Sequence, residues 1–158
     1  MRRVLIVSPY FPPSTLAGVH RARIVAKYLP LWGWEPIVFC VDEQFHEQEL
    51  DPDLAALVDP RIRVIKVAAW PTRLCRRFGL GDLGIRGYPY LKQAVEHVVR
   101  REGADLLFVT ALPGFPMRMG PVMKRRYHLP LVIDYQDLWL PRGYEAVPPL
   151  TKLWLAHQ

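Results

Sequence analysis

The sequence predicts an α/β domain of three layers, with a parallel sheet of about five or more strands in the order 3-2-1-4-5. Short apolar runs alternate with segments in which apolar residues recur at helical spacing. The first run, Val4–Val7, is apolar throughout, as expected of a strand buried on both faces. The 158 residues suit one domain, and neither an internal repeat nor a second domain is evident.

Each predicted strand is a short apolar run bounded by loop residues. The first is followed by a loop with three prolines, and the fifth ends at Asp134. Their regular alternation with helical segments is typical of a Rossmann-like domain. The five strands are expected at Val4–Val7, Pro36–Val41, Ile62–Val67, Leu106–Val109 and Leu131–Ile133.

The predicted helices follow from apolar spacing and from residues that begin or end helices. Gly33 can end the first helix, and Asp51 followed by Pro52 resembles the start of a short second helix. The segment from Trp70 to Gly87 is expected to be irregular and basic, with a clear helix from Tyr90. Apolar stripes mark the helices at Val19, Ala22, Ala26 and Leu29, at Leu91, Ala94, Val95 and Val98, and at Phe115, Met119, Val122 and Met123.

The loop after the first strand is the first candidate site. Ser8–Ala17 has ten residues, whereas such loops commonly have two to six, and it lies where the strand order reverses, the usual place for ligands. Gly18 opens the next helix, whose N–H groups and dipole favour an anion such as phosphate. The candidate substrate-binding residues are Pro13, Gly18, His20 and Arg21. In the alternative interpretation, the glycine serves a tight turn and the prolines stiffen the loop.

The end of the fifth strand is the second candidate site. Asp134 and Asp137 lie three residues apart at the same predicted edge of the sheet. Their carboxylates could accept hydrogen bonds from ligand hydroxyls or orient a nearby arginine. The alternative is that one of them caps a turn or a helix.

The chain is basic, with 21 Lys and Arg against 15 Asp and Glu and a net charge of +6. Such a balance attracts phosphate-bearing ligands, nucleic acids or anionic membranes. The mixture of basic and apolar residues in Thr72–Arg86 suits either a membrane surface or a solvated loop, and Lys124–Arg126 suits a helix end. Nucleic acid is not expected as a partner, because no binding motif appears and the basic residues are not gathered on one helix.

Several other functions are disfavoured. The sequence has neither the GxGxxG pattern of dinucleotide sites nor the Walker A pattern. The two cysteines are far apart and share no ligand spacing with the histidines, so neither a disulfide, a metal nor a cofactor is expected. The first apolar run is too short for a signal peptide. We expect a cytoplasmic protein, and a peripheral location at the inner face of the membrane stays open.

Three N-terminal segments and one later motif together resemble family-4 retaining glycosyltransferases. Arg3–Pro13, Ala17–Arg21 and Tyr28–Pro36 resemble the start of these enzymes. The segment Asp134–Trp139, which reads DYQDLW, resembles their Asp-x-Arg-Asp-x-Trp motif. The resemblance spans Arg3 to about Arg142.

The resemblance implies a GT-B enzyme with two Rossmann-like domains that face each other across a cleft. The N-terminal domain binds the acceptor, the C-terminal domain binds most of the nucleotide sugar, and no metal ion is needed. The loop at Gly18 would face the donor's phosphates and sugar, and Asp134 and Asp137 would line the cleft. Two departures matter: Gln136 stands in place of the motif's Arg, and no His follows the fourth strand. No catalytic residue is therefore assigned.

The resemblance also predicts the domain organisation. Residues 1–142 would form the N-terminal domain, and residues 143–158 would begin a helix or linker toward a C-terminal domain that carries a Glu-x7-Glu motif. We expect the acceptor-binding half of a retaining glycosyltransferase, inactive alone, whose partners are a nucleotide sugar, a glycan or lipid-linked acceptor, and a donor-binding domain or subunit. Two alternatives stay open: a non-catalytic module that binds a membrane surface, an acceptor or a separate donor-binding subunit, and an unrelated flavodoxin-like or nucleotide-binding domain.

Overall fold

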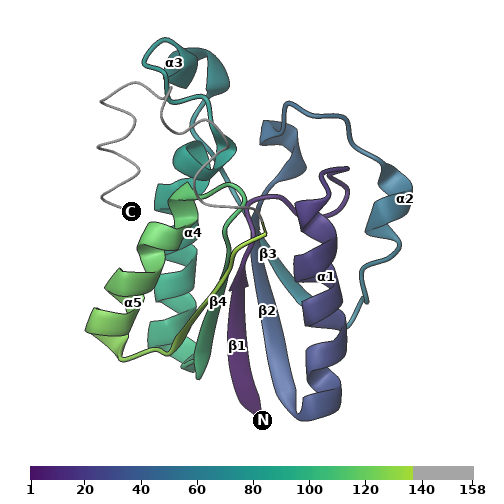
Figure 1. Cartoon of the computed structure of the whole chain (residues 1–158), viewed down its shortest axis with the longest axis vertical. Coiled ribbons are helices and arrows are strands. Elements are labelled where there is room, and N and C mark those ends of the chain that lie inside the picture. The colour runs from purple at the N-terminus through teal and green to yellow at the C-terminus, as the bar shows by residue number, and fades with distance from the viewer. Residues whose placement is uncertain (137–158) are drawn as a thin grey trace.

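The computed structural model describes residues 1–136 of the chain as a twisted parallel sheet covered by helices on both faces (Figure 1). The sheet has five strands in the order β3-β2-β1-β4-β5, which confirms the predicted order. The central strand β1 pairs in parallel with β2 and with β4. The strands are β1 (Arg2–Val7), β2 (Trp34–Val41), β3 (Arg63–Val67), β4 (Leu106–Thr110) and β5 (Leu131–Asp134).

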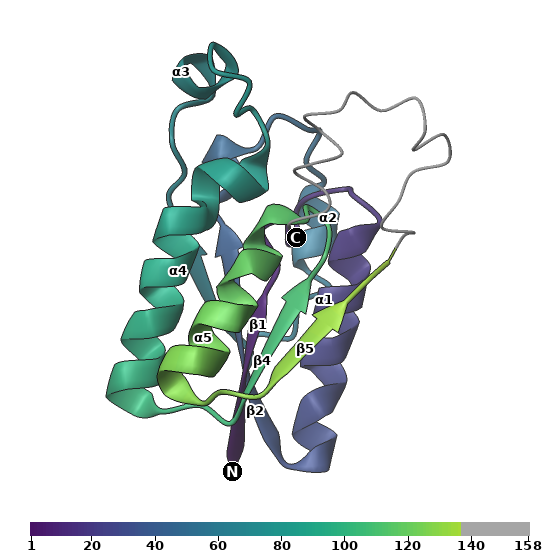
Figure 2. The same ribbon diagram turned by 60° about the vertical axis from the view of Figure 1, so that its left-hand side comes forward.

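The helices are divided between the two faces of the sheet. On one face lie α4 (Leu83–Glu102) and α5 (Met119–Tyr127), and on the other lies α1 (Gly18–Tyr28), with α2 (Pro52–Ala55) beyond it (Figures 1 and 2). Each face has its own apolar core, so the strands are buried on both sides as their continuous apolar runs predict. The remaining short helices are η1 (Leu29–Trp32), η2 (Glu43–Phe45), α3 (Thr72–Arg76) and η3 (Phe115–Arg118).

Two predicted helix boundaries are confirmed by their backbone geometry. Asp51 caps α2, because its carboxylate accepts a hydrogen bond from the N–H of Asp53 at 2.9 Å. Gly33 was predicted to end the first helix; α1 ends at Tyr28 and continues directly into η1, and Gly33 ends η1 with a φ of 77°, a conformation that glycine adopts without steric cost. The predicted domain boundary at residue 142 and the helix or linker expected over 143–158 lie outside the described residues.

The prediction of an irregular segment from Trp70 to Gly87 is wrong in two places. α3 forms within it, and α4 begins at Leu83, seven residues before the predicted start at Tyr90. The early turns of α4 contain two glycines and Pro89, which all weaken the sequence signal for a helix. The carboxylate of Asp82 caps this start by accepting the N–H of Ile85 at 3.0 Å.

Arg86 was expected on the basic surface, and this is also wrong. Its side chain lies inside the protein with 1% of its surface exposed. The guanidinium donates to the carbonyls of Gly81, Trp70 and Phe45 at 3.0 to 3.1 Å. These carbonyls belong to the start of α4 and to the segments after β3 and β2, so one side chain joins three loops near the carboxyl ends of the strands.

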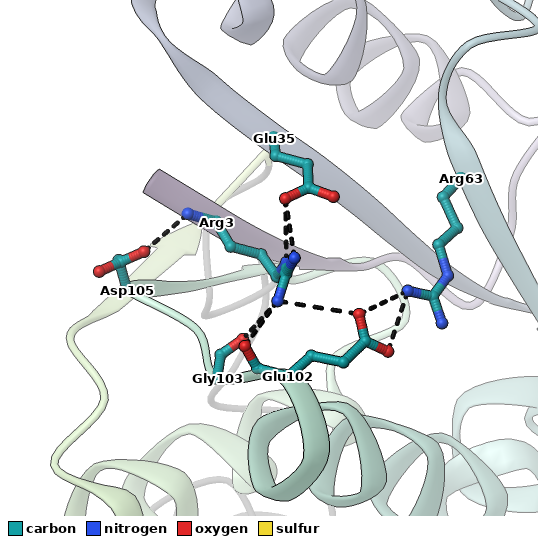
Figure 3. A network of polar contacts seen from close by, with 6 residues as sticks. All are labelled: Arg3, Glu35, Arg63, Glu102, Gly103 and Asp105. Carbon is teal, nitrogen blue, oxygen red and sulfur yellow. Dashed lines mark hydrogen bonds and ion pairs between the residues drawn. The ribbon is translucent and has the colours of Figure 1, made fainter. Parts of the chain in front are cut away.

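The opposite edge of the sheet is held together by a network of charges around Arg3 (Figure 3). Its guanidinium donates to the carboxylate of Glu35 on β2 and to the carbonyl of Glu102 at the end of α4, at distances of 2.7 to 3.1 Å. Arg63 on β3 binds both oxygens of the Glu102 carboxylate at 2.7 and 3.0 Å. The network therefore ties the first three strands of the sheet to the C-terminal end of α4.

This network predicts a loss of stability in acid. The hydrogen bond from Arg63 holds the pKa of Glu102 below its ordinary value of 4.5. Because the folded pKa is lowered, ionised Glu102 stabilises the fold above the unfolded pKa, and this contribution is lost as pH falls through the folded pKa. In urea unfolding between about pH 5 and about pH 3, we expect the free energy of unfolding to fall more steeply for the wild type than for Glu102→Gln. Equal slopes for the two proteins would contradict this role, and Glu49→Gln, at an exposed carboxylate, is the matched control.

Candidate functional site

The carboxyl ends of all five strands meet at one edge of the sheet, where the strand order reverses on either side of β1. Two buried hydroxyl groups connect the adjacent strand ends: Thr110 Oγ1 lies 3.2 Å from Ser8 Oγ, which donates to the carbonyl of Tyr10 at 2.8 Å. These contacts fix the beginning of the long loop that leads from β1 to α1. The loop therefore leaves the switch point of the sheet along a defined path.

A shallow open groove of about 460 Å³ lies where this loop enters α1. The first two turns of α1 form one side of it, and the segments that follow β4 and β5 form the other. The groove thus combines residues from three elements that only the fold brings together. Its lining residues are Ala17, Gly18, His20, Arg21, Ile24, Leu112 and Gln136.

Gly18 is a glycine because two side chains lie close to its backbone. A Cβ atom at this position would lie 3.0 Å from Gln136 Oε1 and 3.4 Å from Leu112 Cδ2. The N–H groups of Val19 and His20 donate back to the preceding loop, whereas those of Ala17 and Gly18 have no acceptor within residues 1–136. The start of α1 therefore offers free backbone donors and the positive end of a helix dipole, which together suit an anion.

A charged pair lies beside these donors. Arg21 Nη1 lies 3.2 Å from Asp134 Oδ1, and the Arg21 side chain is half exposed whereas Asp134 is mostly buried. Gln136 Nε2 lies 3.4 Å from the other oxygen of the same carboxylate. Asp134 therefore holds the guanidinium at the mouth of the groove and offsets part of its charge.

The structure brings together four of the six candidate residues. Gly18, His20 and Arg21 line the groove, and Asp134 is joined to it through Arg21. Pro13 does not line the groove: its carbonyl accepts the N–H of Asp51 at 2.8 Å, so the loop is fastened there to the segment that precedes α2. Asp137 lies outside the described residues.

Four lining residues were not identified as ligand contacts from the sequence. Ala17 directly precedes α1 and Ile24 lies on it, so helical periodicity could have placed both beside the predicted residues. Leu112 follows β4, and the strand order alone places the end of β4 beside that of β1. The sequence distinguishes Gln136 only by the Arg that the resembling motif has at this place, whereas in the structure its side chain packs directly against the position of Gly18.

The described residues hold no group suited to metal binding or thiol chemistry at this edge. Within residues 1–136, no cluster of three or more His, Cys, Asp or Glu side chains could hold a metal ion. Both cysteines are buried, and burial raises the pKa of the Cys40 thiol to about 12. The same part of the chain contains no helix that is long and apolar enough to cross a membrane.

A second hollow of about 220 Å³ lies at the opposite, amino edge of the sheet. It is bordered by Trp34, Ile62 and the exposed ion pair of Asp59 with Arg61. The groove at Gly18 is the stronger candidate, because it lies at the switch point and combines helix-terminal donors with a cation.

The sequence matches no model of a known protein family, and no curated protein matches it. The fold, in contrast, is shared with solved glycosyltransferase structures of the GT-B type. Sucrose-phosphate synthase from Thermosynechococcus elongatus superposes with a TM-score of 0.63 at 12% identity, over 99% of this chain and 39% of that one. Apo UGT2 of Phytolacca americana gives a TM-score of 0.61 at 10% identity, over 94% of this chain and 34% of that one.

A third similar structure is CalG4, the calicheamicin glycosyltransferase, with a TM-score of 0.56 at 15% identity over 99% of this chain and 35% of that one. The Phytolacca americana protein has also been solved with UDP-2fluoro-glucose and pterostilbene. At these identities the likeness shows the fold alone. The chain spans between a third and two fifths of the length of these proteins.

Proposed function

We propose that this chain is the acceptor-side, N-terminal half of a retaining GT-B glycosyltransferase, of the family-4 type, that transfers a sugar from a nucleotide sugar to a glycan or lipid-linked acceptor. The observation that carries the proposal is the groove at the start of α1, where Arg21 and two backbone N–H groups with no acceptor among residues 1–136 lie at the switch point of the sheet. The fold shared with GT-B enzymes supports the same assignment.

The groove suits the charge that develops during sugar transfer. When the bond from the sugar to the nucleotide breaks, negative charge accumulates on the departing diphosphate. Fixed dipoles and cations aimed at that charge stabilise the transition state without reorganising. In our proposal the N–H groups of Ala17 and Gly18 and the guanidinium of Arg21 contact the diphosphate, and Asp134 positions the guanidinium.

The groove also needs a second wall. The groove is shallow and open, so the residues that line it leave a bound ligand exposed to solvent. A donor-binding domain in a continuation of this chain, or in a separate subunit, would close it and exclude water. We therefore expect no measurable sugar transfer by the 158-residue chain alone, and turnover of a nucleotide sugar by that chain would contradict this expectation.

The ion pair at the groove predicts opposite effects of two substitutions on diphosphate binding. Arg21→Gln removes a cation from the groove and should weaken binding about fivefold, as expected for one exposed charge-assisted contact. Asp134→Asn keeps an oxygen that can accept from Arg21 and so position the guanidinium, but it removes the competing negative charge and should strengthen binding about threefold. Calorimetric titration of the two variants and the wild type with inorganic diphosphate at low salt measures both effects.

Thermal unfolding of the same proteins separates binding from structure. Loss of a partly exposed ion pair such as Arg21 with Asp134 should cost about 1 kcal/mol, so both variants should remain folded and nearly as stable as the wild type. Arg125→Gln, at the exposed end of α5, removes the same charge away from the groove and should leave binding unchanged. A diphosphate affinity that fell equally in Arg21→Gln and Arg125→Gln would show that net charge, and not this groove, controls binding.

A further inference from the structure

The segment from Trp70 to Leu80, here called the α3 arm, presents large apolar side chains to solvent. Of the thirteen exposed large hydrophobic residues within residues 1–136, four fall in these eleven positions. Leu74 is 60% exposed and Phe78 is 69% exposed. A small protein rarely exposes so many apolar side chains in one short segment without a partner for them.

The same arm is uniformly basic. It carries Arg73, Arg76 and Arg77, and residues 70–81 include no acidic residue. Arg76 pairs with Glu47 at 3.3 Å, whereas Arg73 and Arg77 have no ion pair within the described residues. The exposed apolar side chains are therefore interleaved with positive charge, most of which no carboxylate among residues 1–136 neutralises.

The fold holds the arm in a fixed, outward-facing conformation. Cys75 is its buried residue, and its carbonyl accepts the N–H groups of Phe78 and Leu80 at 3.0 and 2.9 Å. Arg86 fastens the base of the arm through the carbonyls of Trp70 and Gly81. With Cys75 facing inward, Leu74 and Phe78 lie on the outer side of this compact turn.

The arm projects beyond the carboxyl edge of the sheet, at the end of the molecule where α1 begins (Figures 1 and 2). We propose that the α3 arm docks the chain on an anionic phospholipid surface, with Leu74 and Phe78 in the interface and Arg73 and Arg77 against the headgroup phosphates. The apolar side chains suit the boundary between headgroups and acyl chains, and the arginines suit the negatively charged headgroups above it. This inference does not rest on sugar transfer, because a chain that bound no nucleotide sugar would still dock.

Vesicle sedimentation tests the proposal on the 158-residue chain. The wild type should sediment with vesicles of phosphatidylcholine and phosphatidylglycerol in equal parts, and only weakly with phosphatidylcholine alone. Arg73→Gln combined with Arg77→Gln should weaken binding about 25-fold, since each basic residue near an anionic membrane contributes about fivefold. Leu74→Ser combined with Phe78→Ser should weaken it at least about tenfold, because those side chains then lose their apolar contacts.

The matched control is Lys124→Gln combined with Arg125→Gln, which removes the same charge from the distant end of α5. This variant should bind anionic vesicles like the wild type, and all variants should show wild-type thermal unfolding. Equal losses in the control and the arginine variant would overturn the proposal, as would unchanged binding of the serine variant. Self-association that disappears in the serine variant, without any vesicle binding by the wild type, would identify the arm as a protein contact and also overturn it.

Discussion

Replacing Arg86 with Met is expected to cost about 3 to 5 kcal/mol of unfolding free energy, because about 1 to 3 kcal/mol is lost for each buried polar group left without a partner. The guanidinium is almost fully buried and is the donor for three carbonyls. Methionine fills much of the same volume but donates no hydrogen bond. The partly buried carbonyls of Gly81, Trp70 and Phe45 would then lose the donor that each has in the wild type.

Two further variants separate hydrogen bonding from volume. Arg86→Lys keeps the charge but replaces the planar guanidinium, which can reach three carbonyls, with one compact ammonium group. It should therefore recover only part of the lost unfolding free energy. Arg101→Met makes the original substitution at an exposed position of the same helix and should change stability by less than about 0.5 kcal/mol. Urea unfolding of the four proteins measures the differences, and equal stability of Arg86→Met and Arg101→Met would refute the buried role.

The second large effect is expected at Gly87, where α4 packs closely on β2. A Cβ atom there would lie 2.5 Å from Cγ2 of Val41, a buried and β-branched side chain with little freedom to move. Gly87→Leu should therefore destabilise the fold by about 3 kcal/mol through overpacking. The higher helix propensity of leucine, which favours the variant by nearly 1 kcal/mol, offsets only part of this cost.

The control for Gly87→Leu is Gln93→Leu, which introduces the same side chain at an exposed position of α4. It should be neutral within about 0.5 kcal/mol. If both variants unfold at the same urea concentration, the close contact between α4 and β2 does not limit the size of residue 87.

The strands and the sheet order could be predicted because the pattern that indicates each strand lies within a few consecutive residues. Each strand is a short apolar run, and a parallel sheet with helical connections allows few orders. The start of α4 could not be predicted in the same way. Its glycines and Pro89 lower helix propensity. The cap at Asp82 is local, but the close approach of Gly87 to Val41 joins residues far apart in the sequence.

The sequence predicted those parts of the candidate site that come from the loop after β1 and the start of α1. Gly18, His20 and Arg21 could be identified because a long loop that enters a helix at the switch point has a known physical consequence. Leu112 and Gln136 could not, because only the strand order brings their segments to α1. Arg86 was misplaced for a related reason: charge composition favours the surface, and the three carbonyls that bind it become neighbours only in the folded chain.

The central claim is that the start of α1 receives the diphosphate of a nucleotide sugar, and amide NMR during titration with uridine diphosphate tests it most directly. We predict saturable shifts of the Ala17 and Gly18 amides and of the Gln136 side-chain amide. Because one wall of the cleft supplies only part of the contacts, the Kd should be on the order of 1 mM. Shifts confined to the α3 arm or to Lys124–Arg126, with unchanged Ala17 and Gly18 amides at saturation, would contradict the claim.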